Sequence, residues 1–158
     1  MLTVIEVIKR TTDFFEKRKI ESARLTAELI IAHTLELDRM QLYLQFERPL
    51  PEEELQNIRP LVKRRGQGEP LQYVLGTAPF MNLVLKVDKR VLIPRPETEQ
   101  LVERVCEAFT EQSLGSFIDL GTGSGAIDQH RASPQHAADH AAVHRRCTAG
   151  RGRPADPH

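Results

Sequence analysis

Apolar residues recur every three or four positions through the first 66 residues, a spacing that buries one face of an α-helix. The pattern predicts four helices, over residues 3–18, 22–35, 39–46 and 51–66. The side chains expected to face inward are Val4, Ile8 and Phe15, then Leu25, Leu29, Ala32 and Leu35, then Leu42, Tyr43 and Phe46, then Leu55, Ile58 and Val62. Residues 1–66 are therefore predicted to form a small helical bundle.

The ends of these helices carry recognisable signals. Two hydroxyl residues precede helices and are predicted to cap them, Thr3 and Ser22. The fourth helix has Pro51 in its first turn, three glutamates after it, the basic run Lys63–Arg65 in its last turn, and Gly66 as the expected left-handed residue beyond its end. Pro60 has no amide N–H and is expected to kink or interrupt this helix. Arg64 and Arg65 are expected first to complement the helix dipole, and only second to contact a partner.

The pattern changes after residue 66. Residues 67–76 have the glycine and proline content of a linker, and alternation of apolar and polar residues predicts a strand over 83–87. A short turn is expected to return the chain as a second strand over 91–93. A helix is predicted from Pro96 to about Phe109, and a strand over 116–120. The helix stripe expected to be apolar contains Leu101, Val105 and Ala108, beside Val102, Cys106 and Phe109.

The last 31 residues have a different composition. Residues 128–158 contain no Leu, Ile, Met, Phe or Tyr, and they hold five of the six histidines. A helix or strand packed on a sheet needs an apolar face, and this segment supplies none. We expect it to be disordered or weakly helical. Three histidines spaced four apart, His136, His140 and His144, would share a helix face, but nothing near them could orient a zinc ligand, so no metal site is predicted.

Charge and cysteine content narrow the function classes. The net charge is zero over the whole chain, with +2 in residues 128–158 and −2 in residues 1–127, which favours no nucleic-acid partner. Cys106 and Cys147 have no metal-ligand spacing and cannot build a disulfide framework. No window has the length and apolarity of a membrane span. A cytoplasmic protein is expected, as a monomer or in non-specific association.

A glycine-rich segment near residue 120 points to a cofactor. The run Ile118-Asp119-Leu120-Gly121-Thr122-Gly123-Ser124-Gly125-Ala126-Ile127 is typical of a strand, a tight turn and the start of a helix. Glycine at alternate positions permits positive φ and lets a ligand approach the backbone. Asp119 is open to two interpretations, support of the loop or contact with the ligand. An ordinary strand-to-helix turn is the other interpretation of the loop.

Four segments in this order resemble the peptide chain release factor glutamine methyltransferases, which are S-adenosylmethionine-dependent. The segments are Arg64 to Pro70, Pro70 to Gly76, Val91 to Glu99 and Asp119 to Ile127. The glycine loop alone is common to many methyltransferases and dehydrogenases. Its combination with Leu92-Ile93-Pro94-Arg95-Pro96-Glu97-Thr98-Glu99 and a helical N-terminal part is specific. The resemblance covers residues 1–127.

The resemblance implies a fold and a set of roles. The fold is mixed (α+β or α/β): a helical substrate-recognition domain over 1–66, a linker over 67–76, and the beginning of a Rossmann-like S-adenosylmethionine-binding domain over 77–127, truncated before the tail of 128–158. The residues expected to hold the cofactor are Gly121, Thr122, Gly123, Ser124 and Gly125. The implied partner is a peptide chain release factor, methylated on the glutamine of its Gly-Gly-Gln motif. Arg95 and Glu97 are either part of the cleft or only the start of a helix.

Two motifs of the family are missing from the chain. The family's Asn-Pro-Pro-Tyr motif is absent, since the only asparagines, Asn57 and Asn82, do not precede proline. The acidic residue expected about 20 residues beyond the loop is absent too. We therefore expect a frameshift or truncation after Ile127, no catalytic residues, an inactive chain, and at most weak S-adenosylmethionine binding. The alternatives are a non-catalytic helical module that binds a release factor, and another Rossmann-type methyltransferase.

Overall fold

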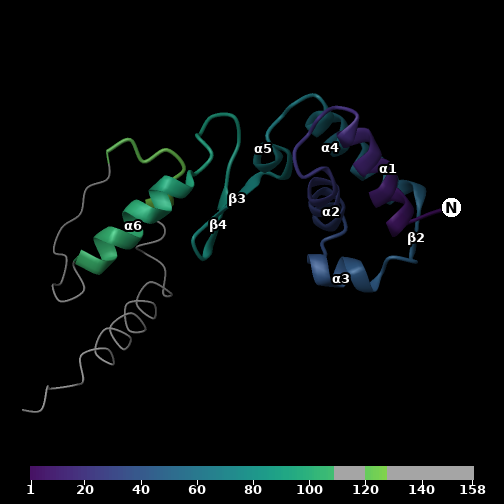
Figure 1. Ribbon diagram of the computed structural model, residues 1–158, viewed down its shortest axis with the longest axis horizontal. Helices are drawn as coiled ribbons and strands as arrows, with labels where there is room; N and C mark the ends of the chain where they lie inside the picture. Colours follow the sequence, from purple (N-terminus) through teal and green to yellow (C-terminus); the bar gives the residue numbers. More distant parts are fainter. Residues whose placement is uncertain (109–119, 128–158) are drawn as a thin grey trace, which may run out of the picture. The chain divides into compact units, whose positions relative to one another are not determined.

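The computed structural model describes residues 1–108 and 120–127, with side chains described up to residue 105 and again from residue 120 (Figure 1). The chain divides into two compact units, Met1–Gly76 and a second that begins at Thr77. The predicted strand over 116–120 is described only at Leu120, and the predicted tail over 128–158 lies outside the described residues.

Helix α1, Val4–Glu16, begins as the sequence predicts. The Thr3 hydroxyl accepts a hydrogen bond from the Glu6 amide, and the Glu6 carboxylate accepts one from the Thr3 amide at 2.9 Å. This reciprocal capping box satisfies two amides that a helix start leaves open. The predicted inward residues Val4, Ile8 and Phe15 are buried.

Helix α2, Ala23–Thr34, corrects two expectations. Ser22 precedes it in a left-handed conformation (φ 49°), and its side chain makes no capping hydrogen bond. Leu25, expected inward, is 41% exposed, whereas Ala27 and Ile30 are fully buried. Because α2 contacts α1, α3, α4 and α5, much of its surface is buried, including Ile30 and Ile31. The predicted stripe is thus confirmed at buried Ala32 and at Leu35, which packs against the core, and it is wrong at Leu25.

A short helix and a two-residue ladder complete this side of the first unit. Helix α3, Arg39–Leu44, starts at a second capping box, between Asp38 and Gln41, which the pattern of apolar residues does not reveal. Leu42 is fully buried, as predicted. Strands β1, Leu2–Thr3, and β2, Pro49–Leu50, pair antiparallel and tie the start of the chain to the segment before α4.

Helix α4, Glu52–Gly66, continues through Pro60, so the expected interruption does not occur. Pro60 is exposed, so water can reach the carbonyl that the missing N–H leaves unpaired. Gly66 is the last helical residue, and the left-handed glycine is Gly68 instead, with φ 91°. The reason for a glycine at 66 is crowding, because a Cβ there would lie 2.5 Å from the Phe14 ring.

The segment expected to be a linker contains a helix of the first unit. Helix α5, Leu71–Leu75, packs on α2 and α4, and its Val74 side chain is buried with Phe15 and Ile30. The Arg64 guanidinium holds α5 in place: it donates to Glu69 and to the carbonyls of Tyr73 and Val74. Residues 67–76 thus lie within the compact unit Met1–Gly76.

The second unit begins with an antiparallel hairpin of β3, Thr77–Phe80, and β4, Leu83–Lys86. The predicted alternation is confirmed, since Leu85 and Val87 are buried and Val84 is 75% exposed. The partner predicted for β4 was wrong. Strand β3 pairs with β4, and residues 91–93 form no strand. Asp88 holds its local turn by accepting hydrogen bonds from the Arg90 amide and guanidinium, which lower the Asp88 pKa to about 2.

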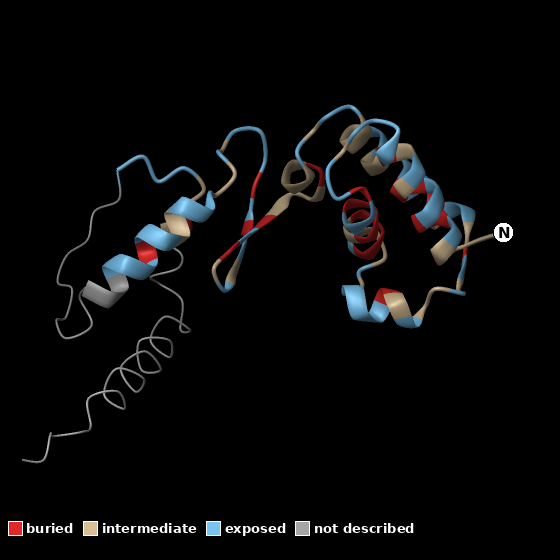
Figure 2. Cartoon of the chain, viewed as in Figure 1, coloured by how far each residue is buried: buried red, intermediate tan, exposed pale blue. Residues whose placement is uncertain are grey.

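Helix α6, Pro96–Ala108, starts at the predicted proline. Of the stripe expected to be apolar, Leu101 and Val105 are 56% and 39% exposed, whereas Val102 is buried. Figure 2 shows the contrast between largely exposed α6 and the buried faces of α2 and the β3–β4 hairpin. The mixed fold class is confirmed in its coarse form: the described residues form helices and two small antiparallel sheets, and a Rossmann-like sheet is not among them.

Candidate functional site

The glycine loop has the backbone that the sequence predicts. Gly121, Gly123 and Gly125 have φ values of 79°, 55° and 72°, in the left-handed region that favours glycine. The Gly125 amide donates to the Thr122 carbonyl at 2.8 Å, which closes a turn just before the helical residues Ala126 and Ile127. The alternate glycines are therefore required by the conformation of the loop.

Open space lies beside two of these glycines. A Cβ at Gly121 would meet no atom within 4 Å, and one at Gly123 only the Gly121 carbonyl oxygen at 3.9 Å. Gly121, Thr122 and Gly123 are exposed, and Ser124 and Gly125 half-buried. A ligand can thus approach this backbone closely, as a cofactor loop requires. Asp119, the other residue of interest here, lies outside the described residues.

The first turn of α6 has a structural carboxylate. Glu99 accepts a hydrogen bond from the Met81 amide at 2.6 Å, which ties the first turn of α6 to the tip of the β3–β4 hairpin. Met81 has a positive φ of 51°, so this contact supports a strained turn. Arg95 and Glu97, by contrast, are exposed, and the Arg95 carbonyl accepts from the Thr98 amide in the first helical turn. Of these residues, only Glu99 is anchored to another element by a side-chain contact described here.

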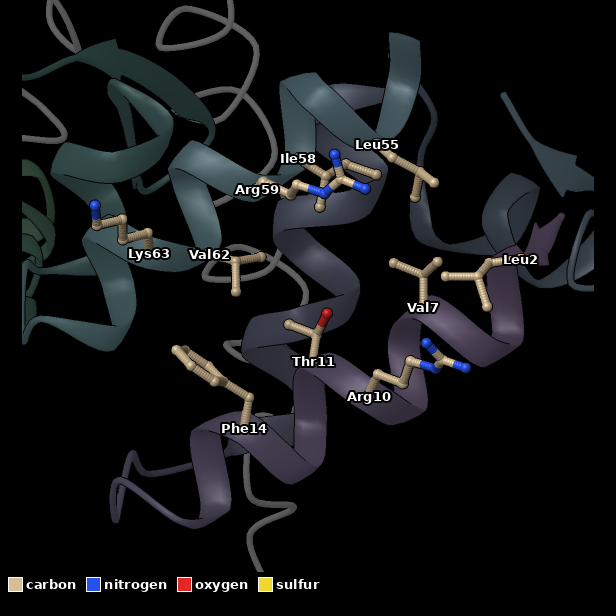
Figure 3. A pocket seen from close by; sticks show the side chains of 10 residues that line it. All are labelled: Leu2, Val7, Arg10, Thr11, Phe14, Leu55, Ile58, Arg59, Val62 and Lys63. Atoms are coloured by element: carbon tan, nitrogen blue, oxygen red, sulfur yellow. The ribbon is translucent and has the colours of Figure 1, made fainter. Parts of the chain in front are cut away.

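An apolar groove runs between α1 and α4 in the first unit (Figure 3). Its volume is about 420 Å³, and ten residues line it: Leu2, Val7, Arg10, Thr11 and Phe14 from β1 and α1, and Leu55, Ile58, Arg59, Val62 and Lys63 from α4. Sequence patterns did not reveal this groove, because it brings together residues of two helices that are far apart in the chain. Both helices pack on α2 more extensively than on each other, with the groove between them.

A buried carboxylate holds α2 and α3 together. Glu28 is 2% exposed and accepts hydrogen bonds from Arg24 (3.0 Å), Arg39 (3.0 Å) and the Tyr43 hydroxyl (2.8 Å). Burial raises the pKa of Glu28, but the hydrogen bonds from Arg24, Tyr43 and Arg39 outweigh burial, so the net shift is downward. With every carboxylate oxygen paired, this cluster is structural.

Membrane-spanning helices and metal clusters are both absent from the described ranges 1–108 and 120–127. No helix there is long and apolar enough to cross a membrane. Within the same ranges, His, Cys, Asp and Glu form no group of three placed to hold a metal ion. The histidines at 136, 140 and 144 lie outside these ranges.

Comparison with known proteins identifies the relatives of this fold. Residues 6–76 match the family model described as the PrmC N-terminal domain. This range ends at the boundary of the first compact unit, Met1–Gly76. The resemblance to the release factor glutamine methyltransferase family is confirmed.

Relatives from distant organisms extend the match beyond that domain. The chain is 46% identical over 130 residues to a release factor glutamine methyltransferase of Chlorobaculum tepidum, covering 79% of this chain and 44% of that protein. It is 40% identical over 129 residues to the one of Rhodopirellula baltica, with the same coverage. The human MTRF1L release factor glutamine methyltransferase is 42% identical over 134 residues, covering 79% of this chain and 40% of its own. The chain thus spans less than half the length of these relatives.

Proposed function

We propose that Met1–Gly76 is the release-factor-recognition module of a protein-glutamine methyltransferase, and that residues 77–127 begin its S-adenosylmethionine-binding domain. The observation that carries this proposal is the coincidence of the compact helical unit, Met1–Gly76, with the matched domain over 6–76. The relatives' names supply the partner class, a peptide chain release factor, and the reaction class, methylation of glutamine. The Gly-Gly-Gln motif is the proposed target.

The cofactor part of the proposal rests on the glycine loop. Three left-handed glycines and the open space beside Gly121 and Gly123 fit a cofactor lying against the backbone. Gly121, Thr122, Gly123, Ser124 and Gly125 would hold S-adenosylmethionine, which supplies the methyl group. The β3–β4 hairpin and the Glu99 carboxylate would position the segment that precedes α6.

This 158-residue chain is proposed to bind a release factor without catalysing methyl transfer. An amide nitrogen is a poor nucleophile, so methylation needs acceptors that hold the amide protons and orient the nitrogen. The family takes these from Asn-Pro-Pro-Tyr, which the chain does not contain. The proposal therefore assigns to this chain the recognition step alone.

Binding and transfer can be tested separately on the purified chain. Calorimetry with the release factor of the same organism should show saturable one-to-one binding. Transfer of labelled methyl from S-adenosylmethionine to that release factor should stay at the level of a reaction without protein. Absence of release-factor binding would contradict the recognition role, and methyl transfer that depends on the chain would contradict its inactivity.

The variant Gly123→Val tests the cofactor loop. Micromolar S-adenosylmethionine binding, lost in Gly123→Val, would show that the loop is a complete site and overturn the expectation of weak binding. Binding too weak to measure in both proteins agrees with the proposal.

A further inference from the structure

We infer that the groove between α1 and α4 is the surface that receives the release factor, through an amphipathic segment with apolar side chains on one face and carboxylates beside them. This inference rests on the proposed recognition role of Met1–Gly76 and adds the binding surface and its chemistry. It uses the groove described above, its shape and its charges.

The shape of the groove favours a peptide segment. Its α1 wall is built from residues between Val7 and Phe14, with Leu2 before the helix, and its α4 wall extends from Leu55 to Lys63. At 1.5 Å per residue, the α4 wall alone is about 12 Å long. Two parallel-running helical walls with an apolar floor form the kind of groove into which an amphipathic segment lays its apolar face.

The apolar part of the groove is more accessible along its sides than at its base. Val7, Leu55 and Ile58 form the buried base, and Phe14 and Val62 are half-buried along it. Phe14 closes one end, where its ring packs under the Arg18 guanidinium at 3.7 Å and leaves no space for a Cβ at Gly66. The groove therefore has a fixed end that limits how far an apolar side chain can extend along it.

The charges on the rim select the partner. Arg10, Arg59 and Lys63 line the groove and are exposed, and no Asp or Glu is among its lining residues. Over residues 1–76 the charges balance, with 12 Lys and Arg against 12 Asp and Glu. The groove is thus a local concentration of positive charge on a neutral unit. Arg59 also pairs with Glu52. The pKa of Glu6, one turn before Arg10 on α1, is lowered first by the backbone hydrogen bond of its capping box and to a smaller extent by Arg10. Among the described residues neither Arg10 nor Lys63 forms a salt bridge, so these two are the sites offered to partner carboxylates.

The test uses charge reversal on both walls of the groove. The double variant Arg10→Glu/Lys63→Glu should bind the purified release factor at least about tenfold more weakly than the wild-type chain, with the greater loss at low salt. The matched control is Lys9→Glu/Lys17→Glu, which makes the same change in net charge at exposed residues outside the groove, one on α1 and one just after its end. The control should bind within about twofold of wild type, and circular dichroism should show equal folding of all three proteins.

Each outcome decides the inference. Equal losses of release-factor affinity in the two double variants would show that only net charge matters, and would overturn the inference. Binding as tight as wild type by the groove variant would also overturn the inference, while leaving the recognition role intact. No binding by the wild-type chain would overturn the recognition role itself. Self-association of the wild-type chain that the groove variant abolishes, seen by sedimentation without release factor, would assign the groove to a second copy and also overturn the inference.

Discussion

The helical unit Met1–Gly76 and the described part of the second unit use their apolar residues differently. Eight of the ten largest fully buried side chains among the described residues belong to the first unit, and only Phe80 and Leu85 to the second. In the second unit, Leu92, Leu101 and Leu120 are 56–88% exposed. The most extensive helix contact of the first unit joins the consecutive helices α1 and α2, and contacts that are near in sequence need no distant strand. Local signals in the sequence therefore locate the helices of the first unit, although the pairing of β1 with β2 and the contacts of α4 and α5 with α2 still join residues far apart in the chain.

The largest expected effect separates the cores of the two units. Phe15→Ala removes a fully buried ring packed with Ala27, Ile30 and Val74, and should cost about 3–5 kcal/mol. That loss is comparable to the whole stability of a small domain, so the helical circular dichroism signal should melt at a much lower temperature.

The matched control is Phe80→Ala, which removes an equally buried ring from β3 in the second unit. It should leave the melting temperature of the helical signal within about two degrees of wild type, because substitutions at distant sites without shared contacts change stability independently. An equal loss of melting temperature in both variants would show that the two units fold as one.

The next largest effect concerns the buried carboxylate of α2. Because the folded-state pKa of Glu28 lies below its ordinary value, the stability it contributes is present above about pH 4.3 and is lost as the pH falls through that lower pKa. Glu28→Gln should lower the free energy of unfolding at neutral pH by about 1–3 kcal/mol and flatten its dependence on acid pH. Urea titrations from neutral to acid pH measure both. Glu36→Gln, at an exposed carboxylate, should change neither; an unaltered acid dependence in Glu28→Gln would contradict the assignment.

A smaller effect tests the crowding at Gly66. Alanine is ordinarily the better helix former by about 1 kcal/mol, but a Cβ here meets the Phe14 ring at 2.5 Å. We expect Gly66→Ala to destabilise the unit by about 1–2 kcal/mol, since overpacking exceeds the gain in helix propensity. In a Phe14→Leu background the same substitution should cost less or become stabilising. Stabilisation by Gly66→Ala alone would show that Phe14 moves away freely.

The smallest expected effect compares two helix starts that look alike in sequence. Thr3→Ala removes a capping hydrogen bond and should cost about 0.5–1 kcal/mol. Ser22→Ala should cost no more than a few tenths of a kcal/mol, because Ser22 makes no capping bond. Denaturant unfolding of both variants measures the difference. Equal costs would mean that the Ser22 hydroxyl does cap α2 in solution.

These two helix starts also show how far sequence reasoning goes. The apolar period located α1 to α4, because helical burial repeats every three to four residues wherever the helix packs. It placed Ala32 of α2 correctly and Leu25 wrongly, since the central position of that helix is a property of the whole bundle. It also expected Gly66 to serve conformation, although its reason is the side chain of Phe14, 52 residues earlier in the chain.

The second unit and the candidate sites divide in the same way. The positive φ of the loop glycines follows from local chemistry and is confirmed. The pairing of β4 with β3 does not follow from local chemistry, because contacts outside any local window decide which strands pair. The Glu99–Met81 contact and the groove between α1 and α4 bring together residues from different elements, so no single segment signals them. The cofactor role of Gly121 to Gly125 stays a prediction.

The assignment of release-factor recognition to Met1–Gly76 and not to the second unit is tested most directly by hydrogen exchange of the purified chain with and without the release factor. The account predicts that the release factor slows exchange in α1 and α4, on both walls of the groove, and leaves residues 77–105 and 120–127 unchanged. Slower exchange in the second unit with none in α1 or α4 would contradict it.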